Sequence, residues 1–450
     1  MAAWRGINTG NVAGACVQKN RRRSVALFPI FFPSLQPTTG TGSHRQPSTD
    51  MIRTAQHRLA QRATSINEAV TLAIAAEAKR MQAAGIPVIS LSTGEPDFPT
   101  PQIIKEAAFD AINSNFTKYT QAEGIPELRK AVAEKFTAEN GIPTEAQQVL
   151  ISCGGKHCLF NALAAIVNQG DEVVIPSPYW TSYPEMVKLV GGTPVLVEAG
   201  YESGYRMTPD QLRQAITPRT RAMIINSPTN PTGVVYSRQE MEAFAEVIAK
   251  AGIYVLSDEL YEKITYDGNQ HVSIGSFPQL RNLALTINGV SKAFSMTGWR
   301  IGYMCGPSDV IAAAGKIQGQ SASNPVSVSQ KAALAALTIP EVADDVKKMG
   351  EAFLRRRDLI VELLQAIPGV RFHIPGGAFY IFLNVAQFYN EQIPDSAALA
   401  GYLLREHLVA TVPGSGFGDD HAIRLSYACA EADIREAVKR IGEGLASLQR

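Results

Sequence analysis

Lys292 is the residue of this 450-residue chain whose setting best suits covalent chemistry. It follows an apolar run at 283–290 that predicts a strand leading into a loop. Such a loop partly desolvates the amine, which keeps it neutral and able to form a Schiff base with an aldehyde. Arg300, eight residues further on, could hold a phosphate in the same site. Taken alone, Lys292 fits an ordinary solvated loop better, so its assignment depends on the residues upstream.

Two further apolar runs end in polar side chains before Lys292. The run at 222–225 leads to Asn230, and the run at 254–256 leads to Asp258. Ligands gather at the carboxyl ends of the strands in an open parallel sheet. We therefore expect the three runs to converge on one ligand.

Several short motifs occur together in this chain, in a fixed order and at matching spacing. They are Gly-Glu-Pro-Asp-Phe at 94–98, Lys-Tyr-Thr at 118–120, Gly-Gly-Lys at 154–156, Pro-Tyr-Trp at 178–180, Asn-Pro-Thr-Gly at 230–233, Ser-Asp-Glu-Leu-Tyr at 257–261, Ser-Lys-Ala-Phe at 291–294, Gly-Trp-Arg-Ile-Gly-Tyr at 298–303 and Ile-Arg-Leu-Ser-Tyr at 423–427. With them the chain resembles the fold-type I aminotransferases that use pyridoxal phosphate, and among these the bacterial and plastid aspartate/prephenate branch, subgroup Iβ. The resemblance runs from about residue 65 to near the C-terminus, which makes it far more specific than any single motif.

The fold that this resemblance implies is α/β, with a large domain whose mainly parallel sheet is flanked by helices, plus a smaller α+β domain. Strand-like runs alternate with helical patterns over the large, cofactor-binding domain, which we predict at 99–336. A polar, Gly/Ser-rich stretch at 319–329 precedes the small C-terminal domain at 337–450. We expect residues 51–98 to form an N-terminal helix and a segment that joins the small domain, and residues 1–50 to be a disordered extension.

The resemblance gives four residues roles around the ring of the cofactor, pyridoxal 5′-phosphate. Asp258 would pair with the protonated pyridine nitrogen, so that the ring can accept the electrons of a carbanion. Asn230 and Tyr261 would hydrogen-bond the phenolate oxygen, and Trp180 would stack on the ring. From the residues alone, Asp258 could also be a turn or N-cap aspartate, and Trp180 an aromatic side chain of the core.

The phosphate of the cofactor needs donors, and a turn at Gly154, Gly155 and Lys156 could supply them. It lies between a strand-like run and an apolar helical pattern, so the free amides of a helix N-terminus would face the anion. The spacing of a nucleoside-triphosphate P-loop, GxxxxGK[ST], is absent. Arg300 would add its guanidinium to the same phosphate.

Two more cofactor contacts follow from the resemblance, Ser291 and Tyr119. In the relatives, the tyrosine at the position of Tyr119 reaches the site from the neighbouring subunit. The resemblance therefore implies a homodimer with shared active sites.

Arg424 is the expected contact for the α-carboxylate of an amino acid, because a planar guanidinium pairs with a carboxylate through two hydrogen bonds. Its apolar neighbours leave an outward-facing strand residue as the alternative. In the resembling branch, a lysine at the position of Lys156 is associated with the distal carboxylate of dicarboxylic substrates. The alternative there is a solvated lysine at the start of a helix. Gly94, Trp180 and Asn230 complete the expected substrate contacts.

These assignments predict an enzyme similar to aspartate aminotransferase. It would move the amino group between L-aspartate, or L-glutamate, and 2-oxoglutarate, or another 2-oxo acid, by a two-stage ping-pong mechanism. Lys292, once displaced by the amino acid, would carry a proton to and from the substrate Cα. Prephenate, aromatic and alanine aminotransferases are the alternatives within the family. Asn67 lies about where a prephenate-active member would carry a basic residue, which favours aspartate.

Three other classes of protein share parts of this pattern. A pyridoxal-phosphate lyase, such as an aminocyclopropane carboxylate synthase, would use the same lysine, aspartate and arginine. A transcription regulator would need a DNA-binding domain, for which residues 1–64 have neither the length nor the helical pattern. A non-catalytic relative is disfavoured, because every cofactor position is filled by a suitable residue.

The composition favours small-molecule substrates. A net charge of +1 gives no electrostatic footprint for nucleic acid or for a membrane surface. The five cysteines show neither a CxxC pair nor zinc spacing, which predicts no metal site and reduced thiols in the core. Cys158 is the candidate for a reactive thiol, since it follows the expected phosphate turn.

Residues 1–49 contain no Asp or Glu and carry three consecutive arginines, at 21–23, as organellar transit peptides do. The competing hypothesis is a start codon chosen too far upstream, since Met51 immediately precedes the family-like sequence. We favour a cytoplasmic protein that starts near Met51, and a plastid or mitochondrial precursor is the alternative.

Overall fold

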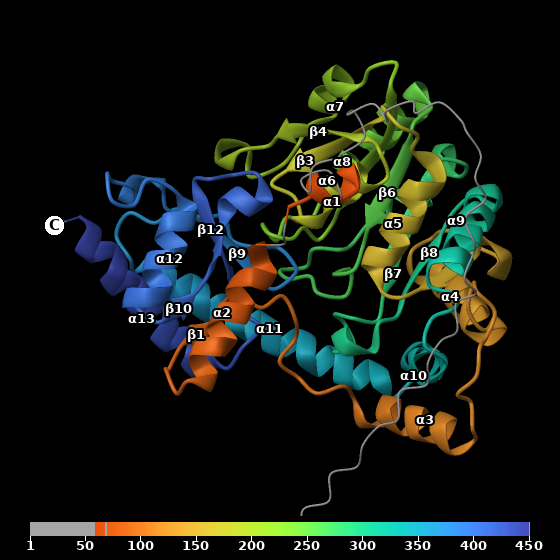
Figure 1. Cartoon of the computed structure of the whole chain (residues 1–450), viewed down its shortest axis with the longest axis horizontal. Helices are drawn as coiled ribbons and strands as arrows, with labels where there is room; N and C mark the ends of the chain where they lie inside the picture. The colour runs from red at the N-terminus through yellow and green to blue at the C-terminus, as the bar shows by residue number, and fades with distance from the viewer. Residues whose placement is uncertain (1–58, 68–69, 450) are drawn as a thin grey trace, which may run out of the picture. The chain divides into compact units, whose positions relative to one another are not determined.

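The computed structural model describes residues 59–67 and 70–449, so the predicted extension over 1–50 lies outside the described residues. A seven-stranded sheet runs through much of this part, in the order β2-β8-β7-β6-β5-β3-β4 (Figure 1). Its strands are β2 Val149–Ser152, β3 Glu172–Ser177, β4 Thr193–Glu198, β5 Thr220–Asn226, β6 Tyr254–Asp258, β7 Ala284–Gly289 and β8 Gly302–Cys305. Neighbouring strands are parallel except for β8, which is antiparallel to both β2 and β7. The carboxyl ends of β2, β5, β6 and β7 therefore meet at one edge.

Helices cover both faces of this sheet. They are α3 Gln102–Asn113, α4 Pro126–Glu139, α5 Gly155–Ile166, α6 Ser182–Leu189, α7 Pro209–Ala215, α8 Arg238–Ala251, α9 Ser308–Ser321 and α10 Ser327–Thr338. On β5, Ala222 and Ile224 pack in one cluster with α5, α6 and α9, whereas Met223 and Ile225 pack in another with α8. Burial on both faces explains why the strands are continuous apolar runs in the sequence. This mainly parallel sheet, flanked by helices, confirms the predicted α/β class.

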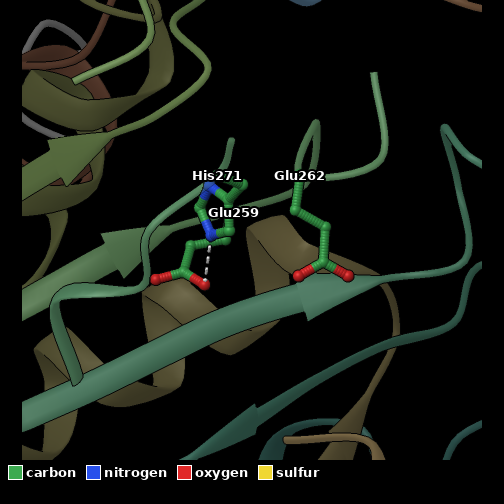
Figure 2. A group of neighbouring side chains, drawn as sticks. All are labelled: Glu259, Glu262 and His271. Carbon is green, nitrogen blue, oxygen red and sulfur yellow. Dashed lines mark hydrogen bonds and ion pairs between the residues drawn. The ribbon is translucent and has the colours of Figure 1, made fainter. Parts of the chain in front are cut away.

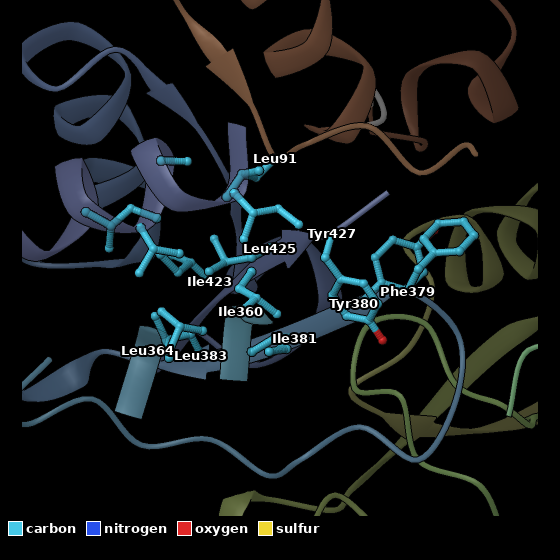
Figure 3. Close-up of a cluster of buried hydrophobic side chains, with 14 of the residues drawn as sticks. Leu91, Ile360, Leu364, Phe379, Tyr380, Ile381, Leu383, Ile423, Leu425 and Tyr427 are labelled. Atoms are coloured by element: carbon cyan, nitrogen blue, oxygen red, sulfur yellow. The ribbon is translucent and has the colours of Figure 1, made fainter. Parts of the chain in front are cut away.

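A smaller antiparallel sheet lies in the C-terminal part of the chain, in the order β11-β12-β9. Its strands are β9 Tyr380–Asn384, β11 Val412–Pro413 and β12 Ala422–Ser426, and the helices of this part are α11 Val342–Gln365, α12 Ser396–Glu406 and α13 Glu431–Leu448. Figure 3 shows the apolar cluster at this sheet, where Ile423 lies opposite Leu383 and Leu425 opposite Ile381. The predicted additional small sheet is thus present.

Two elements connect the large and small sheets. Helix α11 begins in a cluster with α3 and α10, through Val342, and continues into the cluster around β9, through Phe353 and Ile360. Strand β1, Ile89–Ser90, pairs in parallel with β10, Val409–Ala410, so the segment after helix α2, Val70–Ala83, joins the C-terminal part. This pairing brings the Gly-Glu-Pro-Asp-Phe motif to the edge where the large sheet ends.

The structure gives bounds to the N-terminal helix and shows helices where the sequence has a polar stretch. The N-terminal helix predicted within residues 51–98 is α2, Val70–Ala83, and a short turn of helix, α1, precedes it at Gln61–Thr64. Most of the polar stretch at 319–329 is helical, because its first residues end α9 and its last ones begin α10. Serines at the start of a helix resemble a linker in sequence, and here Ser327 and Ser329 are buried. In the described part of the chain, every helix is too short or too polar to cross a membrane.

Gly302 lets β8 pass directly beside the turn at Gly154 and Gly155. A Cβ at residue 302 would clash with the Gly155 amide nitrogen and the Gly154 carbonyl carbon. We expect Gly302→Ala to lower the free energy of unfolding by about 1–3 kcal/mol, because backbone on both sides must move. Gly298→Ala is the control, since its Cβ would meet nothing within 4 Å. Urea unfolding measures both variants, and equal midpoints would contradict the close approach.

Candidate active site

A cavity of about 370 Å³ opens where the carboxyl ends of the large sheet meet the small sheet. The predicted site residues in its wall are Gly94, Gly155, Lys156, Trp180, Asn230, Asp258, Tyr261, Ser291, Lys292, Arg300 and Arg424. Gly154 lies directly behind the wall, where a Cβ would clash with the Arg300 guanidinium. Tyr119 lies outside the cavity and its residue surface is 90% exposed. The three apolar runs thus converge on one cavity, as the sequence predicts.

Lys292 enters this cavity from the loop that follows β7. Its Nζ donates a hydrogen bond of 2.5 Å to the carbonyl oxygen of Gly94. Burial lowers the pKa of Lys292 to about 8, although the nearby Glu95 carboxylate works in the opposite direction. An appreciable fraction of the amine is therefore neutral, and nucleophilic, near neutral pH.

The loop from Ser291 to Arg300 is strained at two residues. Ser295 has a φ of 51° and Arg300 a φ of 56°, in the left-handed region that non-glycine residues rarely adopt. Thr100 donates to the Ser295 carbonyl at 2.6 Å and accepts from Trp299 Nε1 at 3.0 Å, which holds the loop in place. Strain of this kind, about 1–3 kcal/mol per residue, concentrates at functional sites. Here the bend lets both ends of the loop face one cavity.

Asp258 ends β6 with its carboxylate buried. Tyr183 donates a hydrogen bond of 2.7 Å to Oδ2, and the amide of Leu260 donates one of 3.3 Å to Oδ1. Burial raises the pKa of Asp258 to about 6, and these two hydrogen bonds offset part of that effect. A protonated ring nitrogen beside this carboxylate would favour its ionised form. Tyr183 is not predicted from the sequence, although it lies only three residues after Trp180.

Arg424 lies on β12 and borders the cavity from the small sheet. Its Nη2 donates to the Ser92 carbonyl at 2.7 Å and its Nη1 to Asn230 Oδ1 at 3.1 Å. Its Nε is buried without a partner in the described part of the chain. The guanidinium carbon lies 4.5 Å from the centre of the Tyr380 ring and 5.0 Å from that of Phe417. A buried arginine with an unused donor fits a carboxylate ligand.

The opposite end of the cavity is suited to an anion. Gly154 has a φ of 94° and starts α5 without a side-chain cap, which leaves first-turn amides for a ligand. Arg300 anchors beside this turn by donating to the Cys153 carbonyl at 3.2 Å. Lys156 Nζ lies 4.8 Å from the centre of the Trp180 ring, and burial together with Arg300 lowers its pKa. Two cations and a helix N-terminus therefore surround one end of the cavity.

Two residues that the sequence places near the site do not contribute to its cavity. Asn67 does not line the cavity, since its backbone and side-chain nitrogens donate to the Glu185 carboxylate at 2.9 and 3.3 Å. Cys158 is fully buried, and burial raises the pKa of its thiol to about 12, which makes it unreactive. Position in the sequence placed both residues close to the site, but neither side chain faces it.

Figure 2 shows a cluster of charged side chains, Glu259, Glu262 and His271. It follows Asp258 in the chain but lies outside the cavity wall. Glu259 is fully buried; its Oε2 accepts from His271 Nε2 at 2.9 Å and from Asn140 at 3.1 Å. Its Oε1 accepts from two serine hydroxyls, each at 2.7 Å. Burial acts to lower the pKa of His271, but the Glu259 and Glu262 carboxylates together outweigh it and leave the pKa above its usual value.

Glu262 completes this cluster and forms an ion pair with the buried ammonium of Lys135. The ligand atoms of Glu259, Glu262 and His271 lie within 4.8 Å of one another, a spacing that a metal ion could use. Lys135 already supplies the positive charge that such an ion would bring. We therefore interpret the cluster as an internal charge network that fixes the segment after β6.

The chain has extensive similarity to proteins of known class. The model of the family described as "Aminotransferase class I and II" matches residues 86–441. An aspartate aminotransferase of Geobacillus stearothermophilus is 46% identical over 394 residues, 85% of this chain and 98% of that protein. An aspartate/prephenate aminotransferase of Cereibacter sphaeroides is 48% identical over 379 residues, 82% and 94% of the two chains. The solved structure of aspartate aminotransferase from Thermus thermophilus with maleate has a TM-score of 0.83 at 43% identity, covering 86% and 99%.

The lowered pKa of Lys292 should be visible in its reactivity. We expect the rate of acetylation of Lys292 in cofactor-free protein to rise with pH and to level off above about 8. Exposed lysines, whose ordinary pKa is about 10.4, should keep gaining reactivity beyond that pH. Brief acetic anhydride labelling followed by peptide mapping measures both. If Lys292 titrated together with the exposed lysines, burial would not control its pKa.

The charge network should be sensitive to the loss of one partner. We expect Lys135→Met to lower the free energy of unfolding by about 3–5 kcal/mol, because it leaves a buried carboxylate without compensation. The double variant Lys135→Met/Glu262→Gln removes both charges and should recover a large part of that loss. Urea unfolding at neutral pH compares the two. Equal losses in the single and double variants would show that packing, not charge, dominates there.

Proposed function

The chain belongs to the class I and II aminotransferases, and we propose that it moves the amino group of L-aspartate or L-glutamate to a 2-oxo acid such as 2-oxoglutarate. We propose pyridoxal 5′-phosphate as its cofactor. The observation that carries the proposal is a single cavity in which Lys292, with its lowered pKa, lies between an anion site and the buried Arg424.

The residues present fit this cofactor at each of its polar groups. The start of α5 and the Arg300 guanidinium offer donors to its phosphate. The Asp258 carboxylate suits a protonated ring nitrogen, and Tyr261 offers a hydroxyl to the ring oxygen. Because Arg424 occupies the oxygen of Asn230, that side chain has its N–H groups left to donate. When bound, pyridoxal phosphate supplies an electron sink for the electron pair of the broken Cα–H bond.

The chain's own groups then bind the substrate and move its proton. Arg424 holds the α-carboxylate through its unused Nε and a neighbouring guanidinium nitrogen, which orients the Cα toward Lys292. Lys292, as the neutral amine, accepts the proton from this Cα. In the second half of the reaction, its ammonium returns a proton to the Cα of the incoming 2-oxo acid. A pKa of about 8 suits both roles, because the amine and the ammonium are both populated near neutral pH.

Lys156 supports a substrate with a second carboxylate. Its ammonium lies over the Trp180 ring in the cavity wall and has no carboxylate partner in the described part of the chain. A distal carboxylate would supply the missing negative charge. Aspartate and glutamate meet this requirement, as does prephenate, which the name of the Cereibacter sphaeroides relative includes. Prephenate is therefore the second candidate for the oxo acid.

Exposed apolar side chains on α3 and α10 support a homodimer, and Gln330 of α10 donates to the Thr120 hydroxyl, next to Tyr119 in the chain. Phe109 and Ile112 of α3 and Val326 at the start of α10 are 59%, 49% and 52% exposed, and α3 packs against α10. Large exposed apolar residues on neighbouring elements mark an interaction site. A second copy covering them would bring Tyr119 toward the cavity of its partner.

Absorbance of the purified, cofactor-loaded protein tests this function. We expect L-aspartate and L-glutamate, added without an oxo acid, to shift the visible band to shorter wavelength, and L-alanine to leave it unchanged. Lys156→Met should lower kcat/KM for aspartate by about 10–100-fold, since a charged hydrogen bond to the distal carboxylate is lost.

Two controls accompany this measurement. Lys292→Ala should abolish turnover, because it removes the group that moves the proton. Lys79→Met removes another lysine of the cavity wall and should leave the preference for aspartate over alanine intact. A wild-type protein whose band responds to neither dicarboxylic amino acid would overturn the aspartate proposal.

A further inference from the structure

Tyr380, at the start of β9, is a buried residue of the cavity wall with contacts to both halves of the site. Its hydroxyl lies 2.8 Å from the hydroxyl of Tyr261. The face of its ring packs on the Arg424 guanidinium, 4.5 Å from the ring centre to the guanidinium carbon. Tyr380 therefore connects the residue assigned to the cofactor's ring oxygen with the residue assigned to the substrate carboxylate.

The hydrogen bond between the two tyrosines can hold only one of their two protons. Each hydroxyl carries one proton and can also accept. In the described part of the chain, the Tyr261 hydroxyl is the only hydrogen-bond partner of the Tyr380 hydroxyl. The Arg424 guanidinium beside the Tyr380 ring carries only donors, so it cannot accept the Tyr380 proton. If Tyr380 donates, the proton of Tyr261 is free to point into the cavity. In the reverse arrangement, Tyr261 would donate its proton to Tyr380 and have none left for a ligand in the cavity.

We propose that Tyr380 is a positioning residue for Tyr261: its hydroxyl donates to Tyr261 and thereby directs the Tyr261 proton at the anionic ring oxygen of the cofactor. This inference rests on the proposed function. The ring of Tyr380 packs against the guanidinium of Arg424, and this contact does not need the hydroxyl.

The surroundings keep both hydroxyls protonated, as this arrangement requires. Burial raises the pKa of Tyr261 well above its usual value, and burial also raises that of Tyr380 although Arg424 opposes it. A hydroxyl that accepts a hydrogen bond becomes a stronger donor, because linked hydrogen bonds polarise one another. Tyr380 should therefore make Tyr261 a better donor to an anion than an isolated tyrosine is.

Gly94 provides the space for this contact. A Cβ at residue 94 would lie 2.8 Å from the Tyr380 oxygen, closer than a carbon can approach without displacement. The carbonyl of the same glycine accepts from Lys292. The absence of a side chain at residue 94 therefore admits Tyr380 while the backbone there engages the lysine.

Tyr380→Phe tests the inference, because it removes only the hydroxyl. Tyr427→Phe is the matched control, since Tyr427 is equally buried and donates to the Ala378 carbonyl at 3.2 Å, outside the cavity wall. The first readout is the pH midpoint of the absorbance change of the lysine-bound cofactor. With weaker stabilisation of the anionic oxygen, we expect this midpoint to rise by roughly half a unit to one unit in Tyr380→Phe and to stay in place in Tyr427→Phe.

Cofactor affinity and steady-state kinetics give the second readout. We expect the dissociation constant of pyridoxal phosphate to rise by about 3–10-fold in Tyr380→Phe, as for the loss of one hydrogen bond. The KM for aspartate should change by less than about twofold, because the phenyl ring still backs Arg424, while kcat falls. Tyr380→Leu, which also removes the ring, should raise the KM as well.

The outcomes separate this inference from the proposed function. A midpoint in Tyr380→Phe that matches wild type and Tyr427→Phe would overturn the positioning role, even if activity falls. A wild-type protein that forms no lysine-bound cofactor band would instead overturn the choice of cofactor, and the role of Tyr380 would fall with it.

Discussion

Burial of opposite charges at one edge of a sheet is the constraint on which this site depends. Lys292, Asp258 and Arg424 all border the same cavity. Burial lowers the pKa of Lys292 and Arg424 and raises that of Asp258, so it favours the neutral form of each group. Such desolvation is unfavourable, so the surrounding packing must stabilise the fold against it. The apolar clusters on both faces of the large sheet and around β9 supply that stability. The same low-polarity surroundings give the lysine the reactivity that the chemistry uses.

The site is assembled from segments that are remote in sequence, and two connections hold them in register. Helix α11 packs in the clusters of both sheets, and the β1–β10 pair carries the Gly94 segment to the edge of the large sheet. The charge network around Glu259 fixes the segment that carries Asp258 and Tyr261 from the side away from the cavity wall. The reactive residues thus depend on contacts that involve neither substrate nor cofactor.

Local patterns in the sequence predict the parts of this site that lie at strand ends. Lys292, Asp258 and the α5 turn follow apolar runs, so their convergence could be inferred from the geometry of a parallel sheet. Tyr380 could not be found in this way, because an aromatic residue in an apolar run predicts a core position whether or not its hydroxyl reaches a cavity. Tyr183 stands among polar residues at the start of α6, and its hydrogen bond to Asp258 is a tertiary contact that no local pattern predicts. The Lys135–Glu262 pair also escapes sequence reasoning, since it depends on a tertiary contact. Tyr119 is the opposite case: the resemblance predicts it as a cofactor contact, but in the single chain it is exposed and lies outside the cavity.

The double use of Gly94 has a consequence for how related sequences can diverge. The carbonyl of residue 94 can accept from Lys292 whatever side chain that residue carries. The missing Cβ, in contrast, makes room only for the Tyr380 hydroxyl. A lineage that keeps a tyrosine at 380 is therefore held to glycine at 94, and one that shortens the side chain at 380 is released from it. The two positions should covary as a pair, although almost three hundred residues separate them along the chain.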